Sequence, residues 1–252
     1  MVTLVLQCLV GVLALVFGVL AVRVARSQND GSPWQRLNWT TVGAAFAMGG
    51  ISNSLYNVAA VWAFMSGPSS IAWASYLRWS PAGNYAGALT KIAMAVVLLA
   101  ISLRASGWRQ RHIAGTLLAA YGAGSLLGWM EGSHEESVHY TNLAAFDMIE
   151  AVVLLGALFV GLVRNSIDRL LWICVGLYAF RQVLNVLFLS AMSWIRVPGA
   201  WAPQPVHLQI FAMVGYLLMA VIAAHRLRLA RRGVHVPGLL EMPARTTPSM
   251  IG

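Results

Sequence analysis

Four ionisable side chains lie in stretches of the sequence that are otherwise apolar. Lys91, Asp147, Glu150 and Arg181 each fall well inside a long hydrophobic run, and their formal charges cancel. Ionisable residues inside a bilayer are costly and mark either a functional site or a paired structural one. At a rise of about 1.5 Å per helical residue, Lys91 and Asp147 share one depth, and Glu150 and Arg181 share a deeper one. The sequence therefore predicts two layers of ion pairs, Lys91 with Asp147 and Glu150 with Arg181.

Neutral polar residues recur at the same depths with the spacing of a helix face. One group occupies i, i+3 and i+4 on the second apolar run, and another follows i, i+3, i+4 and i+7 on the sixth. The last run adds two more residues. The predicted residues for ligand or ion binding, or for coupling, are Asn53, Tyr56, Asn57, Lys91, Asp147, Glu150, Tyr178, Arg181, Gln182, Asn185, Gln209 and Tyr216.

This polar core has a structural and a functional interpretation. Buried ion pairs can simply hold a bundle together, but they rarely stabilise it more than apolar residues would. The functional interpretation is a polar cavity that binds a small polar ligand or relays ions or protons, with Asp147 and Glu150 as the coupling carboxylates. Lys91, the single lysine of the chain, is then an ion-pair partner, a ligand or proton site, or a Schiff-base amine.

A short acidic and histidine-containing stretch lies between the fourth and fifth runs. His134, Glu135 and His139 belong to it, and His207 lies near the start of the seventh run. Together they are candidate ligands for zinc or another divalent metal. His139 and His207 are alternatively candidate axial ligands of a single haem at the outer face. The remaining interpretation is a solvated acidic loop.

The composition determines which elements must position these residues. The chain has 252 residues, of which 59% are hydrophobic and 10% are charged, and the mean hydropathy is +0.70. Soluble domains carry about 25% charged residues, so the composition excludes a soluble or disordered protein and indicates an integral membrane protein. The net charge of +9 is spread over short arginine groups between apolar runs, which argues against nucleic-acid binding.

The sequence predicts an all-α bundle of seven transmembrane helices. Each crossing needs roughly 20 mostly apolar residues. We expect residues 73–77, between the second and third spans, to lie along the membrane interface as a helix. The predicted spans are 3–20, 42–64, 85–103, 113–130, 141–163, 170–192 and 206–224.

Arginines predict the orientation of this bundle. Twelve arginines lie at one set of span ends and two, Arg78 and Arg196, at the other. Because basic residues concentrate on the cytoplasmic side, we expect the N-terminus outside and the C-terminus inside. The twelve are Arg23, Arg26, Arg36, Arg104, Arg109, Arg111, Arg164, Arg169, Arg226, Arg228, Arg231 and Arg232.

Two further features concern packing and domains. Ala120, Gly124 and Gly128 form a small-residue stripe where another helix, of the same chain or of a second copy, can approach closely.

Residues 1–232 are the expected transmembrane domain, and 233–252 a flexible cytoplasmic tail. We expect no soluble domain after the last span, so that a signal would have to pass through a partner.

The function expected from these patterns is that of a receptor, sensor or carrier, more consistent with a binding protein than with an enzyme. One alternative is an accessory subunit of a larger redox or energy-converting complex. Another is a metal-dependent membrane enzyme that uses the outer Glu/His stretch. The expected partners are the lipid bilayer and a protein partner or second copy, in a cytoplasmic membrane of bacterial type. The cofactor is undetermined, a divalent metal and a single haem being the candidates.

Overall fold

The computed structural model describes residues 2–28, 32–131, 136–193 and 204–233. These ranges are helical apart from short turns and contain no β-strand. Each predicted span coincides with a separate helix, so the all-helical architecture is confirmed. The helices are α1 (Val2–Ser27), α2 (Pro33–Ser66), α3 (Ile71–Ser102), α4 (Gln110–Glu131), α5 (Glu136–Val163), α6 (Arg169–Met192) and α7 (Pro205–Arg231).

Six of these seven helices are long and apolar enough to cross a membrane, and α2 is the exception. α2 is long, with 34 residues, but Asn53, Tyr56 and Asn57 lower the hydropathy of its second half. A helix that faces a polar interior tolerates such residues because its neighbours shield them from lipid. The chain is thus consistent with a helical membrane bundle, and the seventh crossing stays a prediction.

Helix boundaries follow from capping side chains. The hydroxyl of Ser32 accepts a hydrogen bond from the amide of Gln35 at 3.2 Å, and Pro33 follows at the first helical position of α2. Ser70 caps α3 in the same way, and the carboxylate of Asp168 caps α6 by accepting from the Leu170 amide at 2.9 Å. Such caps satisfy amides that a helix start leaves unpaired, so the sequence itself sets where these helices begin.

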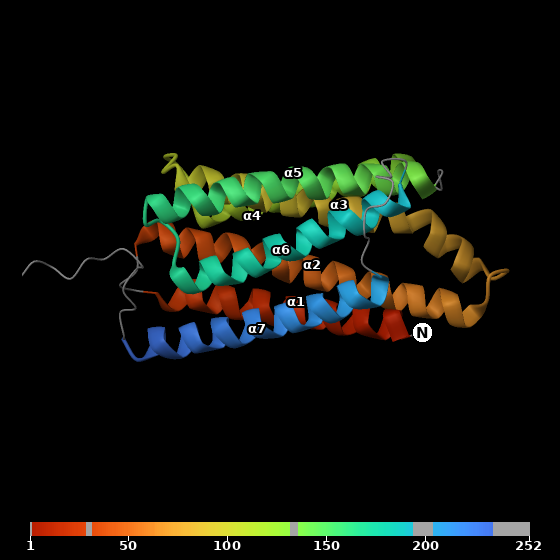
Figure 1. Ribbon diagram of the computed structural model, residues 1–252, viewed down its shortest axis with the longest axis horizontal. Helices are drawn as coiled ribbons and strands as arrows, with labels where there is room; N and C mark the ends of the chain where they lie inside the picture. The colour runs from red at the N-terminus through yellow and green to blue at the C-terminus, as the bar shows by residue number, and fades with distance from the viewer. Residues whose placement is uncertain (1, 29–31, 132–135, 194–203, 234–252) are drawn as a thin grey trace, which may run out of the picture.

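The helices run side by side along one axis (Figure 1). Six of them form a closed ring in the order α1, α2, α3, α5, α6, α7 and back to α1. α4 packs outside this ring, against α3 and α2. The first and last helices are neighbours, so residues from both ends of the described chain form one wall.

α3 contains the segment that was expected to lie along the interface. One helix runs through it into the third span, with Pro81 inside. Proline cannot donate the backbone hydrogen bond to the carbonyl four residues earlier, and the Ser80 hydroxyl donates to that carbonyl, of Leu77, at 3.2 Å. Figure 1 shows the first turns of α3 oblique to the bundle, next to the end of α2. The segment is helical as predicted, but it is continuous with the third span.

Two glycines allow α4 to approach α3 closely. A Cβ atom on Gly124 would collide with the backbone of Tyr85, and one on Gly128 with the backbone of Pro81. Small residues let membrane helices pack by close backbone contact where no hydrophobic effect drives them together. The predicted small-residue stripe is therefore confirmed at Gly124 and Gly128, and its partner is α3 of the same chain.

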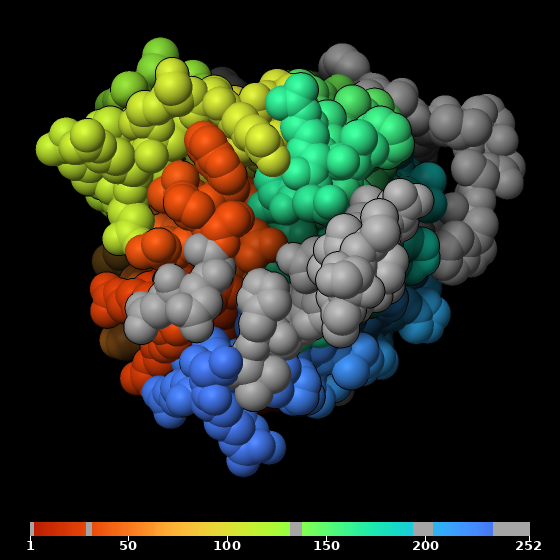
Figure 2. All heavy atoms as spheres, turned by 90° about the vertical axis from the view of Figure 1, so that its left-hand side faces the viewer, coloured from red at the N-terminus to blue at the C-terminus, as the bar shows by residue number. Residues whose placement is uncertain are grey.

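The arginine-rich helix ends meet at one end of the bundle. The end of α1, the start of α2, the turns from α3 to α4 and from α5 to α6, and the end of α7 lie there (Figure 1). Figure 2 views this end, where the start of α2 (orange) lies between the end of α7 (blue) and the turn after α3 (yellow). All twelve arginines of the predicted cytoplasmic set are among the described residues, whereas Arg196 of the opposite set lies outside them.

A buried ion pair joins α6 to α7 at this end. Asp168 and Arg226 are 2.8 Å apart, and their side chains are 5% and 7% exposed. Gln28 donates to the same carboxylate at 3.5 Å, and Asn38 donates to the Ser166 carbonyl at 2.9 Å. The turn between α5 and α6 is thereby attached to α1, α2 and α7, which fixes the ring at this end.

We expect Arg226→Leu to destabilise the protein by about 3–5 kcal/mol, because it leaves the Asp168 carboxylate buried without its cation. Arg228→Leu, a change at an exposed position of the same helix, is the matched control and should shift stability by no more than about 0.5 kcal/mol. Thermal unfolding in a neutral detergent measures both. Equal unfolding midpoints for the two variants would contradict a structural role for this ion pair.

Candidate functional site

The ring of helices encloses a cavity of about 170 Å³ that contains many of the predicted polar residues. α2 contributes Asn53 and Tyr56, and α3 contributes Asn84 and Lys91 across from them. α6 and α7 complete the polar wall, and α1 contributes only apolar residues. Of the predicted site residues, Asn53, Tyr56, Lys91, Tyr178, Arg181 and Tyr216 line the cavity.

The two carboxylates lie behind this wall, between α5 and α6. Glu150 is fully buried and Asp147 is 4% exposed, and neither lines the cavity. Gln182, also fully buried, donates from its amide nitrogen to Glu150 at 2.6 Å and to Asp147 at 3.1 Å. The Tyr178 hydroxyl donates to the other Glu150 oxygen at 2.7 Å, and Asn185 donates to the other Asp147 oxygen. All four carboxylate oxygens therefore accept hydrogen bonds from uncharged donors.

Arg181 connects this network to the cavity. Its guanidinium donates to the side-chain amide oxygen of Gln182 at 2.7 Å. The guanidinium also lies 6.0 Å from the ring centre of Tyr216. A guanidinium over an aromatic face gains a cation–π attraction. One glutamine side chain thus links the cation at the cavity to both carboxylates behind it.

The sequence predicted direct ion pairs of Lys91 with Asp147 and of Arg181 with Glu150, and this prediction is wrong. In the described part of the chain, neither Lys91 nor Arg181 forms an ion pair with a carboxylate, and the ion pairs present there join Arg226 to Asp168 and His139 to Glu131. The physical reason is that amide and phenol groups already satisfy the carboxylate oxygens. The charge of Lys91 acts on Glu150 only through space.

The charge of the cavity wall is consequently positive. Lys91 and Arg181 line it, whereas its lining includes no aspartate or glutamate. The phenol of Tyr216 and the amides of Asn53 and Asn84 also line it and can donate hydrogen bonds. The Tyr178 hydroxyl lines it too, but it already donates to Glu150. Such a surface suits an anionic or strongly hydrogen-bonding group.

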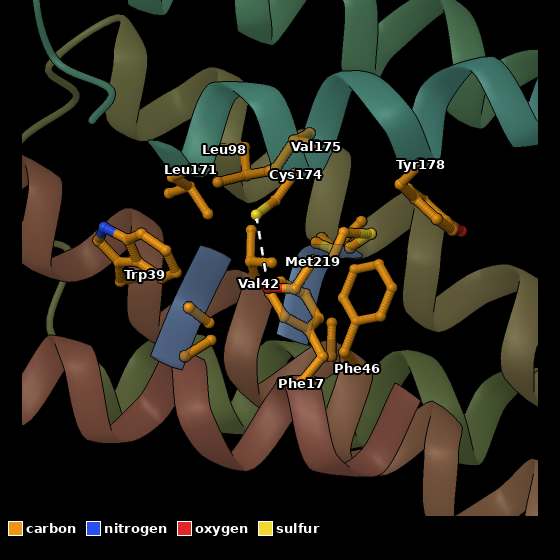
Figure 3. Packing of buried hydrophobic residues seen from close by; sticks show 14 of the residues in the cluster. Phe17, Trp39, Val42, Phe46, Leu98, Leu171, Cys174, Val175, Tyr178 and Met219 are labelled. Atoms are coloured by element: carbon orange, nitrogen blue, oxygen red, sulfur yellow. Dashed lines mark hydrogen bonds between the residues drawn. The ribbon is translucent and has the colours of Figure 1, made fainter. Parts of the chain in front are cut away.

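Aromatic residues form the apolar side of the cavity. Phe46 lines it and packs edge-on against Phe17, Tyr178 and Tyr216, with ring centres 5.0, 4.8 and 5.7 Å away. Figure 3 shows Phe17 and Phe46 beside Met219, with the Tyr178 hydroxyl pointing away from this apolar cluster. The cavity therefore has an apolar side, to which Phe46 belongs, beside its polar wall.

Three further predicted residues occupy different surroundings. Asn57 is buried and donates to Asn53 at 3.1 Å, so it supports the cavity wall from behind. Asn185 belongs to the carboxylate network. Gln209 lies on α7 and makes no side-chain hydrogen bond to another described residue, so the structure does not bring it to the site.

The outer histidines do not assemble a metal centre within the described residues. No group of three or more His, Cys, Asp or Glu side chains that could hold a metal occurs there. His134 and Glu135 lie outside the described residues, and His207 is exposed at the start of α7. His139 and His207 are the members of the predicted metal set that the structure describes, and neither belongs to a group that could hold a metal.

His139 instead joins a packed polar cluster between α3, α4 and α5. It lies 3.5 Å from Glu131 through one ring nitrogen and 3.2 Å from the Asn84 side chain through the other. Its ring stacks on Tyr85 at 5.3 Å, whose hydroxyl accepts from Asn142 at 2.9 Å. One ring nitrogen is hydrogen-bonded to Asn84, the other faces Glu131, and the ring stacks on Tyr85, and these contacts disfavour the haem interpretation that makes His139 an axial ligand.

Asn84 and Gly87 are among the lining residues that the sequence interpretation missed, as are Ser52 and Gly83. Asn84 and Gly87 line the cavity with Lys91, and the three follow the spacing i, i+3 and i+7 of one helix face. The signal was thus present in the sequence. It is weak because glycine and a single asparagine are common in membrane helices for packing reasons.

No protein-family model matches this chain, and neither does any curated protein or solved structure. The function has to be argued from the geometry of the cavity.

We expect Gln182→Leu to destabilise the protein by about 1–3 kcal/mol, because both buried carboxylates then lose a donor. Gln209→Leu removes a glutamine of the same size outside the network and should leave the unfolding midpoint nearly unchanged. Thermal unfolding in neutral detergent compares the two variants. If Gln182→Leu is as stable as Gln209→Leu, the glutamine does not hold the carboxylates.

Proposed function

We propose that this integral membrane protein binds a small anionic group in the cavity enclosed by its helices, as a receptor or carrier. The observation that carries the proposal is the separation of charge across the cavity wall. Lys91 and Arg181 line the cavity, whereas Asp147 and Glu150 lie behind it with their oxygens satisfied by neutral donors. A ligand therefore meets two cations without competing carboxylates.

The size of the cavity limits the group that it accepts. About 170 Å³ is the space of roughly five or six waters at about 30 Å³ each. Pockets for drug-sized ligands measure about 300–1,000 Å³. A carboxylate, phosphate or sulfate group with few further atoms fits these dimensions.

The hydrogen bonds of Arg181 suggest how binding is sensed. The guanidinium now donates to Gln182, and the same glutamine donates to both carboxylates. An anion that attracts Arg181 competes with the Gln182 carbonyl for it. Releasing that carbonyl frees the amide to rotate, which changes the hydrogen bonds of Asp147 and Glu150 on α5. This coupling suits either a receptor or a carrier.

We further propose that the arginine-rich end lies in the cytoplasm, following the positive-inside rule. In a bacterial host, green fluorescent protein fused after Arg232 should fluoresce, and alkaline phosphatase fused there should be inactive. Fusions after Ser66, at the opposite end of the bundle, should give the reverse. The inverse pattern at both sites would show that the bundle has the opposite orientation.

Anion binding is tested by thermal unfolding of the purified protein in neutral detergent. The probes are acetate, succinate, phosphate and benzoate, with acetamide and succinamide as uncharged analogues at matched ionic strength. We expect at least one anion to stabilise the protein, by about 2.7 kcal/mol at a hundred times its Kd. The amides should have no effect.

Two variants locate this binding in the cavity. Lys91→Met removes a cation, and Gly87→Leu fills the cavity at a position where an added Cβ meets no atom within 4 Å. Both should lose the anion-dependent shift, whereas Gly156→Leu, at another uncrowded glycine outside the cavity, should keep it. Absence of a shift with every anion, or its persistence in Gly87→Leu, would refute the proposed function.

A further inference from the structure

A second hollow, of about 550 Å³, lies between α2 and α3 and is bordered by Tyr121 of α4. We call it the α2–α3 groove. Its lining is mainly apolar and aromatic, and several of these side chains are largely exposed: Leu55 by 67%, Val58 by 62%, Trp62 by 67% and Trp79 by 54%. A groove with this lining, on helices inside a membrane, is open to hydrocarbon.

The groove and the polar cavity share a wall. Ser52, Tyr56 and Gly83 line both of them. The Tyr56 hydroxyl is 2.7 Å from that of Tyr76 in the groove, and the Ser52 hydroxyl is 3.1 Å from that of Tyr121. Two hydroxyl pairs therefore close the space between an apolar groove and a cationic cavity.

Gly83 makes this shared wall thin. An added Cβ there would touch the Tyr56 ring at 3.4 Å, and nothing else lies within 4 Å. At this position the Tyr56 ring is therefore the side chain that lies between the two hollows.

We propose that the ligand is a single-chain anionic amphiphile drawn from the surrounding bilayer, with its head group in the cavity and its chain in the α2–α3 groove. This inference rests on the proposed function, because the cavity must first accept an anion. It adds the chemical class of the ligand and a lateral route of access between α2 and α3.

The dimensions of both hollows agree with such a ligand. The cavity accommodates only a small head group, such as a carboxylate, as argued above. The groove extends from Ser52 to Trp62, and ten helical residues rise about 15 Å. It therefore takes an extended hydrocarbon chain along α2 while the head group stays at the level of Ser52.

The energetics favour an amphiphile over a purely apolar lipid. A chain gains little by leaving lipid for an apolar groove, because lipid tails are as apolar as the groove. An anion inside a bilayer, by contrast, is costly unless it meets cations or donors. Specific occupancy must therefore come from the head group meeting Lys91 and Arg181.

Photolabelling of the protein in phosphatidylcholine nanodiscs tests this inference. The probe is dodecanoate with a diazirine near the end of its chain, and the control probe is dodecanol with the same diazirine. We expect dodecanoate to label residues 55–62 and 72–80, to be displaced by unlabelled dodecanoate, and to label there roughly tenfold more than dodecanol. Labelling spread evenly over all lipid-facing helices, or equal labelling by both probes, would overturn the inference.

Matched variants separate the groove from the cavity. Ala59→Trp fills the groove at an exposed position that does not line the cavity, and it should abolish labelling while the shift with short anions remains. Ala123→Trp, at an exposed position of α4 that lines neither hollow, should be labelled by the dodecanoate probe as strongly as the unmodified protein. Short-anion binding without dodecanoate labelling refutes only the amphiphile, whereas absence of both refutes the anion site as well.

Discussion

The amide of Gln182 is the interaction on which the polar interior depends. Two carboxylates one helical turn apart on α5 repel each other, and in a medium of low dielectric constant that repulsion is strong. Gln182 donates to Asp147 and Glu150 together, while Tyr178 and Asn185 satisfy their remaining oxygens. Buried polar groups are tolerated only when each one has its partners. α6 therefore has to present these side chains toward α5, which sets the rotation of both helices.

This arrangement decides what the cavity can recognise. If the carboxylates paired directly with Lys91 and Arg181, the charges of both cations would be neutralised inside the protein. The cavity would then present no net charge to a ligand. Neutral donors replace the cations, so the cations remain on the cavity wall. The net charge of the interior is balanced overall, yet the surface that a ligand meets is positive.

The sequence predicted the helices and most of the polar cluster, because both follow from periodicities that do not depend on tertiary structure. Hydropathy located each helix, and the i, i+3, i+7 pattern identified the face of α6 that carries Tyr178, Arg181 and Asn185. The pairing was not predictable in this way. Depth places Lys91 level with Asp147, but whether they touch depends on the rotation of α3 relative to α5. Counting charges favoured ion pairs and ignored the amide that intervenes.

The outer histidines illustrate a different limit. His139 has the spacing of a metal ligand, but spacing along one segment says nothing about neighbours from other helices. Glu131, Asn84 and Tyr85 surround its ring, and only the packing of α3 against α4 and α5 brings them there. The glycines of α4 that permit this packing were visible in the sequence, although their partner helix was not.

Closure of the ring between α1 and α7 has a consequence for biosynthesis. Tyr216 on α7 is part of the cavity wall, as are Val10 and Ala14 on α1, so the wall is complete only once α7, far along the chain from α1, has been synthesised. Until α7 is inserted, the helices before it lie in the membrane with Lys91 and Arg181 only partly enclosed by other helices. Because unsatisfied charges in lipid are costly, water or other polar groups must accompany them until α7 arrives. A chain that is released before α7 is complete leaves the cavity open along one side.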